Sequence, residues 1–421
     1  VITALLMLPI SSSSDTPAPF VDVLFTAVSA VCVTGLTTVD TATYWSPFGQ
    51  AVIAAGIVVG GLGVMTLASI LGFAVSRHLG LTQRMLATQE TGTGAMGQIS
   101  LLLKAVIATS LTMQALLAAV FLPRFLSMGI DPVRAVWDAV FMAISVFNNA
   151  GFVILPEGLS PHVTDWWMLI PIILGTTVGA IGFPVIMDVA KNLRTPRRWR
   201  LHTKLTLSTY LILAFVGALA LALTEWNNPA TLGAIDTPSK ILNAMLAGVN
   251  SRSSGLSALD VGAMQTQTHF VQDILMMIGG GSASTAGGVK VTTFAVLVLA
   301  VIAEARGDRD IETFGRRIPT SAVRLAVAVS LLGLALVAVS VVLLLSMTHY
   351  SLDIILFETA SAFATVGLST GITPILPVGA KYVLIFLMFA GRTGSMTVAA
   401  ALALRERSRV IRMPEEQPII G

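Results

Sequence analysis

Long apolar runs, enough to cross a membrane several times, are the feature that most limits what this chain can fold into. A helix needs about 20 predominantly apolar residues to cross a bilayer. Only 11% of the residues are charged, too few for the solvated surface of a soluble domain, which carries about 25%. The sequence therefore excludes a soluble enzyme and a disordered chain, and it predicts an all-α polytopic membrane protein. Seven runs are long enough to span the membrane, at roughly 51–75, 101–126, 166–189, 205–224, 270–304, 323–347 and 382–404.

The first ten residues are also apolar, but they are too few to cross a bilayer. No basic region precedes them, so they lack the pattern of a secretory signal. We interpret Val1–Ile10 as the outer end of a helix that begins before this sequence, which raises the expected number of spans to eight. A short interfacial segment is the alternative.

Basic residues gather in alternate connections between the predicted spans. The connection between positions 189 and 205 holds six basic residues and no acid, and the positive-inside rule places such a connection in the cytoplasm. Alternation then places the connections near 76–100 and 305–322 on the same side. We therefore expect a multi-pass protein of the plasma membrane with cytoplasmic N and C termini.

Each connection predicted to lie outside contains an apolar stretch that is too short to cross the membrane as a helix. A re-entrant half-helix is the natural interpretation. In three of the four stretches, an N-cap residue is followed directly by proline, which is a helix-start signal. The stretches are 17–33, 132–150, 238–254 and 352–366, with expected N-caps at Thr16, Asp131, Thr237 and either Ser351 or Asp353.

Each half-length stretch ends in a short polar segment with glycine, and these glycines recur every 104 to 116 residues. A serine stands six residues before the glycine in three of the four segments. A fixed period indicates an internal repeat, here of helix, half-helix, glycine loop and helix. We place the repeats at 1–75 (with a truncated first helix), 76–190, 191–304 and 305–421.

Four glycine loops arranged about one axis would line a pore. Glycine permits positive φ and close backbone approach, so carbonyl oxygens can face the axis and replace the water around a cation. The C-terminal end of each half-helix carries about −0.5 charge, which favours a cation there. The side chains vary between the loops and include no carboxylate, which indicates coordination by backbone. The candidate filter is Val33, Thr34 and Gly35; Asn149, Ala150 and Gly151; Ser253, Ser254 and Gly255; and Thr365, Val366 and Gly367.

A glycine-rich segment interrupts the run 270–304 near mid-membrane. Five of the ten residues 279–288 are glycine, and each disfavours a helix by about 1 kcal/mol relative to alanine. A loop beneath the filter would be placed to block the pore. Arg392 lies about ten residues into the last run, where a cation is costly and indicates a function. The candidate gate residues are Gly279, Gly280, Gly281, Ser282, Gly287, Gly288, Lys290 and Arg392.

Three basic residues near the predicted filter allow more than one interpretation. Arg392 would either repel a permeating cation or donate hydrogen bonds to carbonyls of the glycine-rich loop, and a paired structural arginine is the bland alternative. Lys290 would act in gating or at an interface. Arg252 stands three residues before Gly255, so we expect its side chain to point behind the filter, toward an acid or carbonyl groups.

Several motifs carry a family resemblance. They are Ala-Val-Cys-Val-Thr-Gly-Leu-Thr-Thr-Val-Asp at 30–40, Phe-Asn-Asn-Ala-Gly-Phe at 147–152, Ser-Arg-Ser-Ser-Gly-Leu-Ser-Ala-Leu-Asp at 251–260, Ser-Ala-Phe-Ala-Thr-Val-Gly-Leu-Ser at 361–369, the glycine-rich stretch 279–294, and Gly-Arg-Thr-Gly-Ser at 391–395. These motifs resemble those of the Trk/Ktr/HKT superfamily of potassium transporters, and they are most similar to the Ktr-type membrane subunits. The resemblance covers nearly the whole chain.

The resemblance implies four M1–P-loop–M2 repeats arranged pseudo-fourfold around a central pore, in a homodimer. It implies a cytoplasmic nucleotide-binding ring of the RCK type (KtrA-like) as regulator, and it favours a gating role for the glycine-rich loop and Arg392. In the family, the two residues before each glycine supply the coordinating carbonyls. Glycine at all four positions goes with K⁺ selectivity, and serine at the first goes with Na⁺ permeation. K⁺ is the expected transported ion, and Na⁺ is a candidate activator. The lipid membrane is the expected environment. Neither an organic cofactor nor a nucleic-acid partner is expected.

Three other interpretations compete with the pore. In the first, the glycines of the four loops only let helices pack closely, as small residues do in membranes. An intramembrane protease would need paired acids or serine with histidine inside the spans, which the runs lack, so the chain is not expected to be an enzyme. An ion-coupled (Na⁺- or H⁺-linked) secondary cation transporter would also contain a broken helix such as 270–304.

Overall fold

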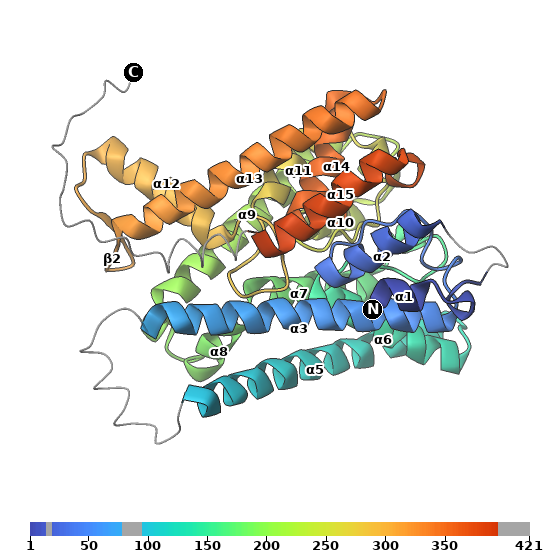
Figure 1. The fold of residues 1–421 in the computed structure, drawn as a ribbon, viewed down its shortest axis with the longest axis horizontal. Coiled ribbons are helices and arrows are strands. Elements are labelled where there is room, and N and C mark those ends of the chain that lie inside the picture. The colour runs from blue at the N-terminus through green and yellow to red at the C-terminus, as the bar shows by residue number, and fades with distance from the viewer. Residues whose placement is uncertain (14–18, 78–94, 395–421) are drawn as a thin grey trace.

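The protein, seen in a computed structural model that describes residues 1–13, 19–77 and 95–394, is built almost entirely from helices (Figure 1). The α-helices are α1 (Ile2–Leu6), α2 (Phe20–Cys32), α3 (Pro47–Arg77), α5 (Ala95–Ser127), α6 (Pro132–Asn148), α7 (Trp166–Ile181), α8 (Phe183–Lys191), α9 (Leu201–Glu225), α10 (Thr237–Asn250), α11 (Thr266–Met277), α12 (Val291–Arg306), α13 (Thr320–Met347), α14 (Leu352–Ala364) and α15 (Val378–Phe389). Shorter turns are the 3₁₀-helices η1 (Pro9–Ser11), η2 (Ser160–His162), η3 (Pro196–Arg198), η4 (Leu232–Ala234), η5 (Val261–Ala263) and η6 (Thr373–Ile375), and the π-helical turn η7 (Ala390–Gly394).

Helices form at the predicted spans. In the part of the chain that the structure describes, three helices are long and apolar enough to cross a membrane, or four if the bent pair α7–α8 counts as one span. The three are Leu103–Ser127 within α5, α9 and α13. Helix α3 covers the predicted run 51–75. The run 382–404 begins as α15 and η7, while its remainder, the C-terminal tail and most of the connection 76–100 lie outside the described residues.

The predicted run 166–189 is not one continuous helix. Helices α7 and α8 meet at 96°, and Gly182 between them has φ of +90°, a conformation that residues with a side chain rarely adopt. A Cβ added at Gly182 would lie 2.7 Å from the carbonyl oxygen of Ser282. The bend therefore needs glycine, both for its backbone conformation and for the close approach of the segment before α12.

All four predicted half-length stretches form helices, namely α2, α6, α10 and α14. Helix α2 begins at Phe20, three residues after the predicted start, with Pro19 at its N-cap position. The expected cap Thr16 lies outside the described residues. Of the two candidates for the fourth helix, Ser351 occupies the N-cap position.

Aspartates cap the middle two half-helices. The Asp131 carboxylate accepts hydrogen bonds from two backbone amides of the first turn of α6, as predicted. In α10 the prediction was wrong by one residue, because Asp236 rather than Thr237 is the N-cap, and its carboxylate accepts from the backbone amide of Ser239. A carboxylate at this position satisfies free amides and complements the helix dipole.

A small β-hairpin departs from the all-α prediction. Strands β1 (Ile311–Thr313) and β2 (Arg316–Ile318) pair antiparallel, with Ile311 opposite Ile318. The two residues between them, Phe314 and Gly315, both have positive φ, which is the conformation of a tight two-residue hairpin turn. The hairpin joins α12 to α13 in the connection predicted to be cytoplasmic.

The helices pack in a closed order. The helix that follows each predicted glycine loop contacts the next half-helix along the chain: α3 contacts α6, α7 contacts α10, and α11 contacts α14. The last of these helices, α15, returns to α2. This closing contact contains a buried ion pair between Lys381 and Asp22, with Nζ 2.8 Å from the carboxylate.

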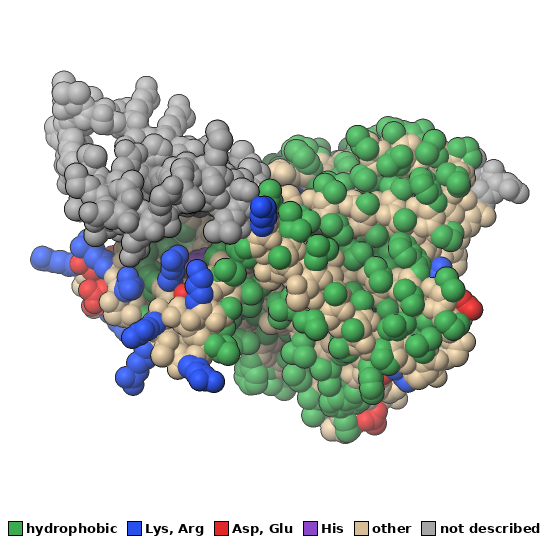
Figure 2. Space-filling view, turned by 90° about the horizontal axis from the view of Figure 1, so that it is seen from below, with side chains coloured by type: hydrophobic (Ala, Val, Ile, Leu, Met, Phe, Trp, Pro, Cys, Tyr) green, Lys and Arg blue, Asp and Glu red, His purple; other side chains and the backbone are tan. Residues whose placement is uncertain are grey.

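The surface separates apolar flanks from a basic end. Figure 2 shows hydrophobic side chains over most of the body, while Lys and Arg side chains gather at the end that Figure 1 assigns to α8 and the β-hairpin. Exposed apolar residues lie along the long helices, for example Phe215 and Leu223 on α9 and Val342 on α13. Such a surface suits a protein whose apolar flanks lie in a bilayer and whose basic end lies on the cytoplasmic side.

We predict that replacing Lys381 with methionine lowers the free energy of unfolding by about 3–5 kcal/mol, because it leaves the Asp22 carboxylate buried without its partner. Adding Asp22→Asn to the same protein should recover most of that loss. Unfolding in detergent, followed by fluorescence, measures both.

Arg317→Met is the matched control for this prediction. Arg317 pairs with Asp310 at 2.9 Å, but both side chains are exposed, so its loss should cost less than about 1 kcal/mol. A loss for Lys381→Met as small as that of the control would contradict a structural role for the buried pair.

Candidate functional site

Four glycine-containing loops meet in a closed ring. We number them loop 1 (residues 33–35), loop 2 (149–151), loop 3 (253–255) and loop 4 (365–367). In each loop, a Cβ added to the glycine would lie less than 3.0 Å from a carbonyl oxygen of the next loop. The contacts run from Gly35 to Ala150, from Gly151 to Ser254, from Gly255 to Val366, and from Gly367 to Thr34.

The ring contacts have one regular form. In every case the carbonyl that lies against the glycine belongs to the residue directly before the glycine of the neighbouring loop. All four glycines have positive φ, between +60° and +95°. Because any side chain would collide with the neighbouring backbone, the glycines are required both for conformation and for space. The sequence-predicted filter residues are thus brought together.

Three of the half-helices end in the same hydrogen-bonded turn. Val33, Asn149 and Thr365 adopt the left-handed conformation at the C-caps of α2, α6 and α14. Each helix ends with the paired hydrogen bonds of a Schellman motif. In this motif, the amide of the residue after the left-handed one donates to the backbone carbonyl of the serine that stands six residues before the glycine. Left-handed backbone is costly for residues other than glycine, and such strain is typical of functional sites.

The serine that recurs before the glycine has a second task in two loops. Ser29 Oγ accepts a hydrogen bond from the Gly35 amide at 3.1 Å, and Ser361 Oγ accepts one from the Gly367 amide at 3.1 Å. These bonds explain the serine spacing in loops 1 and 4, whereas Ser145 Oγ before loop 2 has no hydrogen-bond partner among the described residues.

Loop 3 differs from the other three. Helix α10 ends at Asn250, and its C-cap Ser251 is in a right-handed conformation. The amides of Ser253, Ser254 and Gly255 each donate to the carbonyl of Asn250 at 3.2 Å. Ser253 stands at the position that is left-handed in the other three loops, but its own φ is not positive. The four loops therefore share a ring without sharing one backbone geometry.

Solvent exposure alternates in the same way along all four loops. The glycine is half-buried, its two neighbours are buried, and the second residue after it is half-buried again. The side chains before the glycine are therefore turned away from the accessible side, as expected where backbone makes the contacts. Sequence reasoning missed the positions two residues beyond the glycines, which are Thr37, Val153, Ser257 and Ser369.

A second set of glycines supports the loops from behind. A Cβ added at Gly60, Gly179 or Gly391 would collide with the carbonyl oxygen of Val31, Phe147 or Phe363, respectively. Each of these carbonyls lies four residues before the loop glycine. The helices after loops 1, 2 and 4 therefore pack directly on the last turns of their half-helices. Gly60 and Gly179 were missed in the sequence because helix glycines are common in membranes.

Arg252 does not make the predicted contacts. Its fully buried guanidinium lies over the ring of Tyr210, with Cζ 3.7 Å from the ring centroid, which is a cation–π contact. None of its three guanidinium nitrogens has a hydrogen-bond partner among the described residues. An aromatic face, rather than an acid or carbonyls, thus accommodates this charge behind loop 3.

The glycine-rich segment forms a buried loop between α11 and α12, residues 278–290 (the α11–α12 loop). The break predicted in the run 270–304 is confirmed. The amide of Gly281 donates to the Ala180 carbonyl at 2.7 Å, which fixes the loop to α7. A Cβ added at Gly287 would collide with Thr365 Oγ1 and would lie 2.8 Å from the Ala364 carbonyl oxygen. The loop therefore lies directly against loop 4.

Two basic side chains donate to carbonyls of the α11–α12 loop. Arg392, buried within the π-helical turn η7, donates from Nη1 to the Thr285 carbonyl. Lys290, at the N-cap position of α12, donates from Nζ to the Ala286 carbonyl. Arg392 therefore makes the predicted hydrogen bond to a carbonyl of the glycine-rich loop. A π-turn often marks a functional position within a helix.

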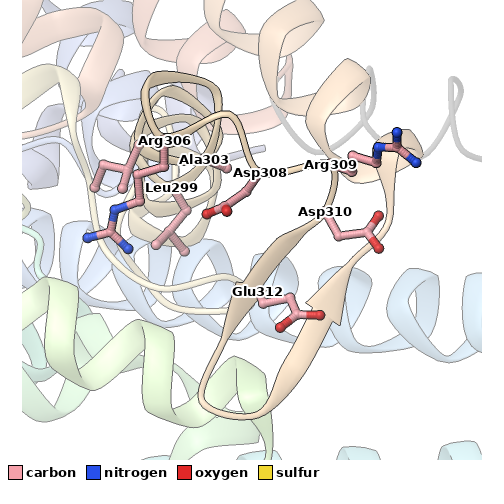
Figure 3. Close-up of a pocket in the computed structure, with 8 residues that line it drawn as sticks. Leu299, Ala303, Arg306, Asp308, Arg309, Asp310 and Glu312 are labelled. Carbon is pink, nitrogen blue, oxygen red and sulfur yellow. The ribbon is translucent and has the colours of Figure 1, made fainter.

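A separate cavity of about 340 Å³ lies away from the ring, at the end of α12 beside the β-hairpin (Figure 3). Leu299 and Ile302 line its apolar part, while Arg306, Asp308 and Glu312 supply charges of both signs. No pattern in the sequence predicted this cavity. In the described part of the chain, no cluster of three or more His, Cys, Asp or Glu side chains could hold a metal ion.

A bundle of apolar helices whose half-helices bring four glycine loops together defines a membrane transport protein. Comparison with known proteins specifies the class. Residues 2–411 match the TrkH family, described as cation transport proteins, and the chain belongs to this family.

Individual relatives are similar over almost the whole chain. The chain is 38% identical to the "Ktr system potassium uptake protein B" of Bacillus subtilis over 417 residues, which cover 99% of this chain and 93% of the relative. It is 34% identical to the "Potassium/sodium uptake protein NtpJ" of Enterococcus hirae over 430 residues, covering 99% and 93%. The crystal structure of the potassium transporter TrkH from Vibrio parahaemolyticus has the same fold, with a TM-score of 0.71 over 92% of this chain and 79% of that chain at 18% identity.

We predict that Gly367→Ala destabilises the protein more than Gly371→Ala does. The two glycines have nearly equal φ, +95° and +92°, but a Cβ at Gly367 would collide with the Thr34 carbonyl, whereas nothing lies within 4 Å of one at Gly371. Both variants carry the backbone strain, about 1–2 kcal/mol, and only Gly367→Ala adds overpacking, about 1–3 kcal/mol. Thermal unfolding in detergent measures the difference, and equal losses would contradict the close ring contact.

Proposed function

We propose that the protein takes up potassium across the plasma membrane through a K⁺-selective, gated, channel-like pore. The closed ring of the four loops carries this proposal, because each loop glycine lies against a carbonyl oxygen of the next loop. The closed packing order of the helices supports a pseudo-fourfold arrangement of four M1–P-loop–M2 repeats, with boundaries at 1–75, 76–190, 191–304 and 305–421.

Backbone carbonyls of the residue pairs before the glycines serve as the ligands of K⁺. They present partial charge without a carboxylate, which suits a monovalent cation that must bind and then leave. The ends of α2, α6, α10 and α14 converge on the ring and add the negative ends of their helix dipoles. Relatives named as potassium uptake proteins support K⁺ as the ion. Na⁺ is proposed as a candidate activator.

The α11–α12 loop and Arg392 form the gate. The loop is buried, packs against loop 4, and is held by a hydrogen bond from Arg392. Opening requires the loop to move away from these contacts, so the strength of its attachment sets the basal flux. The gate residues are Gly279, Gly280, Gly281, Ser282, Gly287, Gly288, Lys290 and Arg392.

The basic end of the molecule faces the cytoplasm, together with both termini, and a nucleotide-binding ring of the RCK type docks there. The names of the relatives, which describe components of a Ktr system, support a separate regulatory subunit. The β-hairpin and the cavity beside it belong to this end (Figure 3). Two copies of the chain form the membrane-embedded homodimer.

An ion-coupled secondary cation transporter is the second candidate function. The broken helix pair α11–α12 and the bend between α7 and α8 favour it, since broken helices often form the binding sites of such transporters. A relative is named for both potassium and sodium uptake. Uptake that requires a second ion would support coupling over a conducting pore.

We predict that Gly35→Ser raises Na⁺ permeation relative to K⁺, because the side chain displaces the Ala150 carbonyl that lies against Gly35. Uptake of K⁺ and Na⁺ into liposomes containing the purified protein measures the ratio. Gly371→Ser, at equal φ with no neighbour within 4 Å, is the control. An unchanged ratio in Gly35→Ser would contradict the filter assignment at loop 1.

We predict that Arg392→Ala increases K⁺ flux in the absence of any partner, because the α11–α12 loop loses the hydrogen bond to the Thr285 carbonyl. The control is Arg324→Ala, which removes an exposed arginine from α13. Rubidium uptake into liposomes compares the two. Normal insertion with wild-type flux in Arg392→Ala would exclude this gate.

A further inference from the structure

One buried amide connects the filter loops with the gate loop. Asn149 lies in loop 2 and has no exposed surface. With its amide oriented so that both ends are satisfied, the nitrogen donates to Ser253 Oγ at 2.9 Å and to the Thr176 carbonyl at 3.2 Å. The oxygen accepts from Thr285 Oγ1 at 2.6 Å. A single side chain thus contacts loop 3, helix α7 and the α11–α12 loop.

Thr285 is the partner of Asn149 on the gate side, and it is fully buried. Its hydroxyl faces Asn149, while its carbonyl accepts the hydrogen bond from Arg392. The hydroxyl also lies 3.1 Å from the Gly179 carbonyl oxygen, beneath the last turn of the half-helix before loop 2. One residue of the α11–α12 loop therefore joins the arginine to loop 2 directly and to loop 3 through Asn149.

The location of Asn149 makes these contacts consequential. Asn149 is itself a residue of loop 2, with its backbone in the left-handed conformation (φ of +58°), so a shift of its side chain acts directly on the backbone of that loop. Movement of the α11–α12 loop would remove Thr285 and leave the buried amide oxygen with the Ala180 backbone amide, at 3.3 Å, as its remaining donor. Losing the shorter of two hydrogen bonds at a buried polar group costs free energy, so movement of the loop favours a shift of the Asn149 side chain.

We infer that Thr285 is a positioning residue for the filter, and that the chain of contacts Thr285–Asn149–Ser253 couples cation selectivity to the state of the gate loop. This inference rests on the proposed function. Coupling between two sites is reciprocal. A change at Thr285 therefore alters ion selectivity, and a change at Ser253 alters gating.

The test measures K⁺ and Na⁺ binding to the purified protein by isothermal titration calorimetry, a readout that does not need an open gate. Thr285→Val keeps the side-chain shape but removes the hydroxyl, and it should lower the preference for K⁺ over Na⁺ by about fivefold or more, the lower range of measured couplings. Thr285→Ser restores the hydroxyl and should restore the preference.

Thr348→Val is the matched control. The Thr348 hydroxyl donates to the Leu344 carbonyl of its own helix end at 2.8 Å and contacts neither the filter loops nor the α11–α12 loop through that bond, so its removal should leave the preference at the wild-type value. A wild-type preference in Thr285→Val would overturn the coupling and leave the pore proposal standing. Absence of any K⁺ preference in the wild-type protein would overturn the pore proposal and the coupling with it.

Ser253→Ala provides the reciprocal measurement, and it keeps the inference testable if Thr285→Val does not fold. This substitution is in loop 3, where the Ser253 hydroxyl hydrogen-bonds to Asn149. Because it removes a partner of the Asn149 amide, it should raise partner-free rubidium flux in liposomes. Altered selectivity with unchanged flux would show that loop 3 and the gate are independent, and would overturn the inference.

Discussion

The approach of four glycines to four carbonyl oxygens is the constraint on which the rest of the structure depends. Each glycine lies where a side chain would collide with the neighbouring loop. Because these contacts run from each loop to the next and return to the first, a displacement at one loop shifts the others. The half-helices that carry the loops are in turn held by the closed packing order of the helices, which ends in the contact between α15 and α2. Backbone spacing at the ring is thus set by the whole bundle.

The α11–α12 loop uses the same physical device. Gly287 approaches loop 4 and Gly182 approaches Ser282 without room for a side chain, so backbone packs on backbone at the proposed gate as well as at the proposed filter. Polar side chains then connect the two layers through Thr285 and Asn149. A loop that is packed closely but held by a few hydrogen bonds can move without unfolding its surroundings. That combination suits a gate that responds to a partner at the basic end of the molecule.

Local signals in the sequence predicted much of this arrangement, whereas the long-range contacts could not be predicted from it. The half-helices, the break near 279–288 and the ring residues could be predicted, because caps, run lengths and glycines act within a few residues. The bend at Gly182 was missed, since an apolar run conceals it. The surroundings of Arg252 were wrongly predicted, because Tyr210 belongs to another helix. Asn149 and Thr285 are 136 residues apart, and Asp22 and Lys381 are 359 apart, so no local pattern pairs them.

The most direct test of a backbone filter is to locate the ion. Anomalous diffraction from crystals of the protein grown in rubidium salts would show whether Rb⁺, a close substitute for K⁺, lies inside the ring. The account predicts anomalous density on the axis, bounded by carbonyl oxygens from all four loops, and its loss when Na⁺ replaces Rb⁺. Density confined to side-chain carboxylates elsewhere, or none within the ring at Rb⁺ concentrations that support uptake, would contradict it.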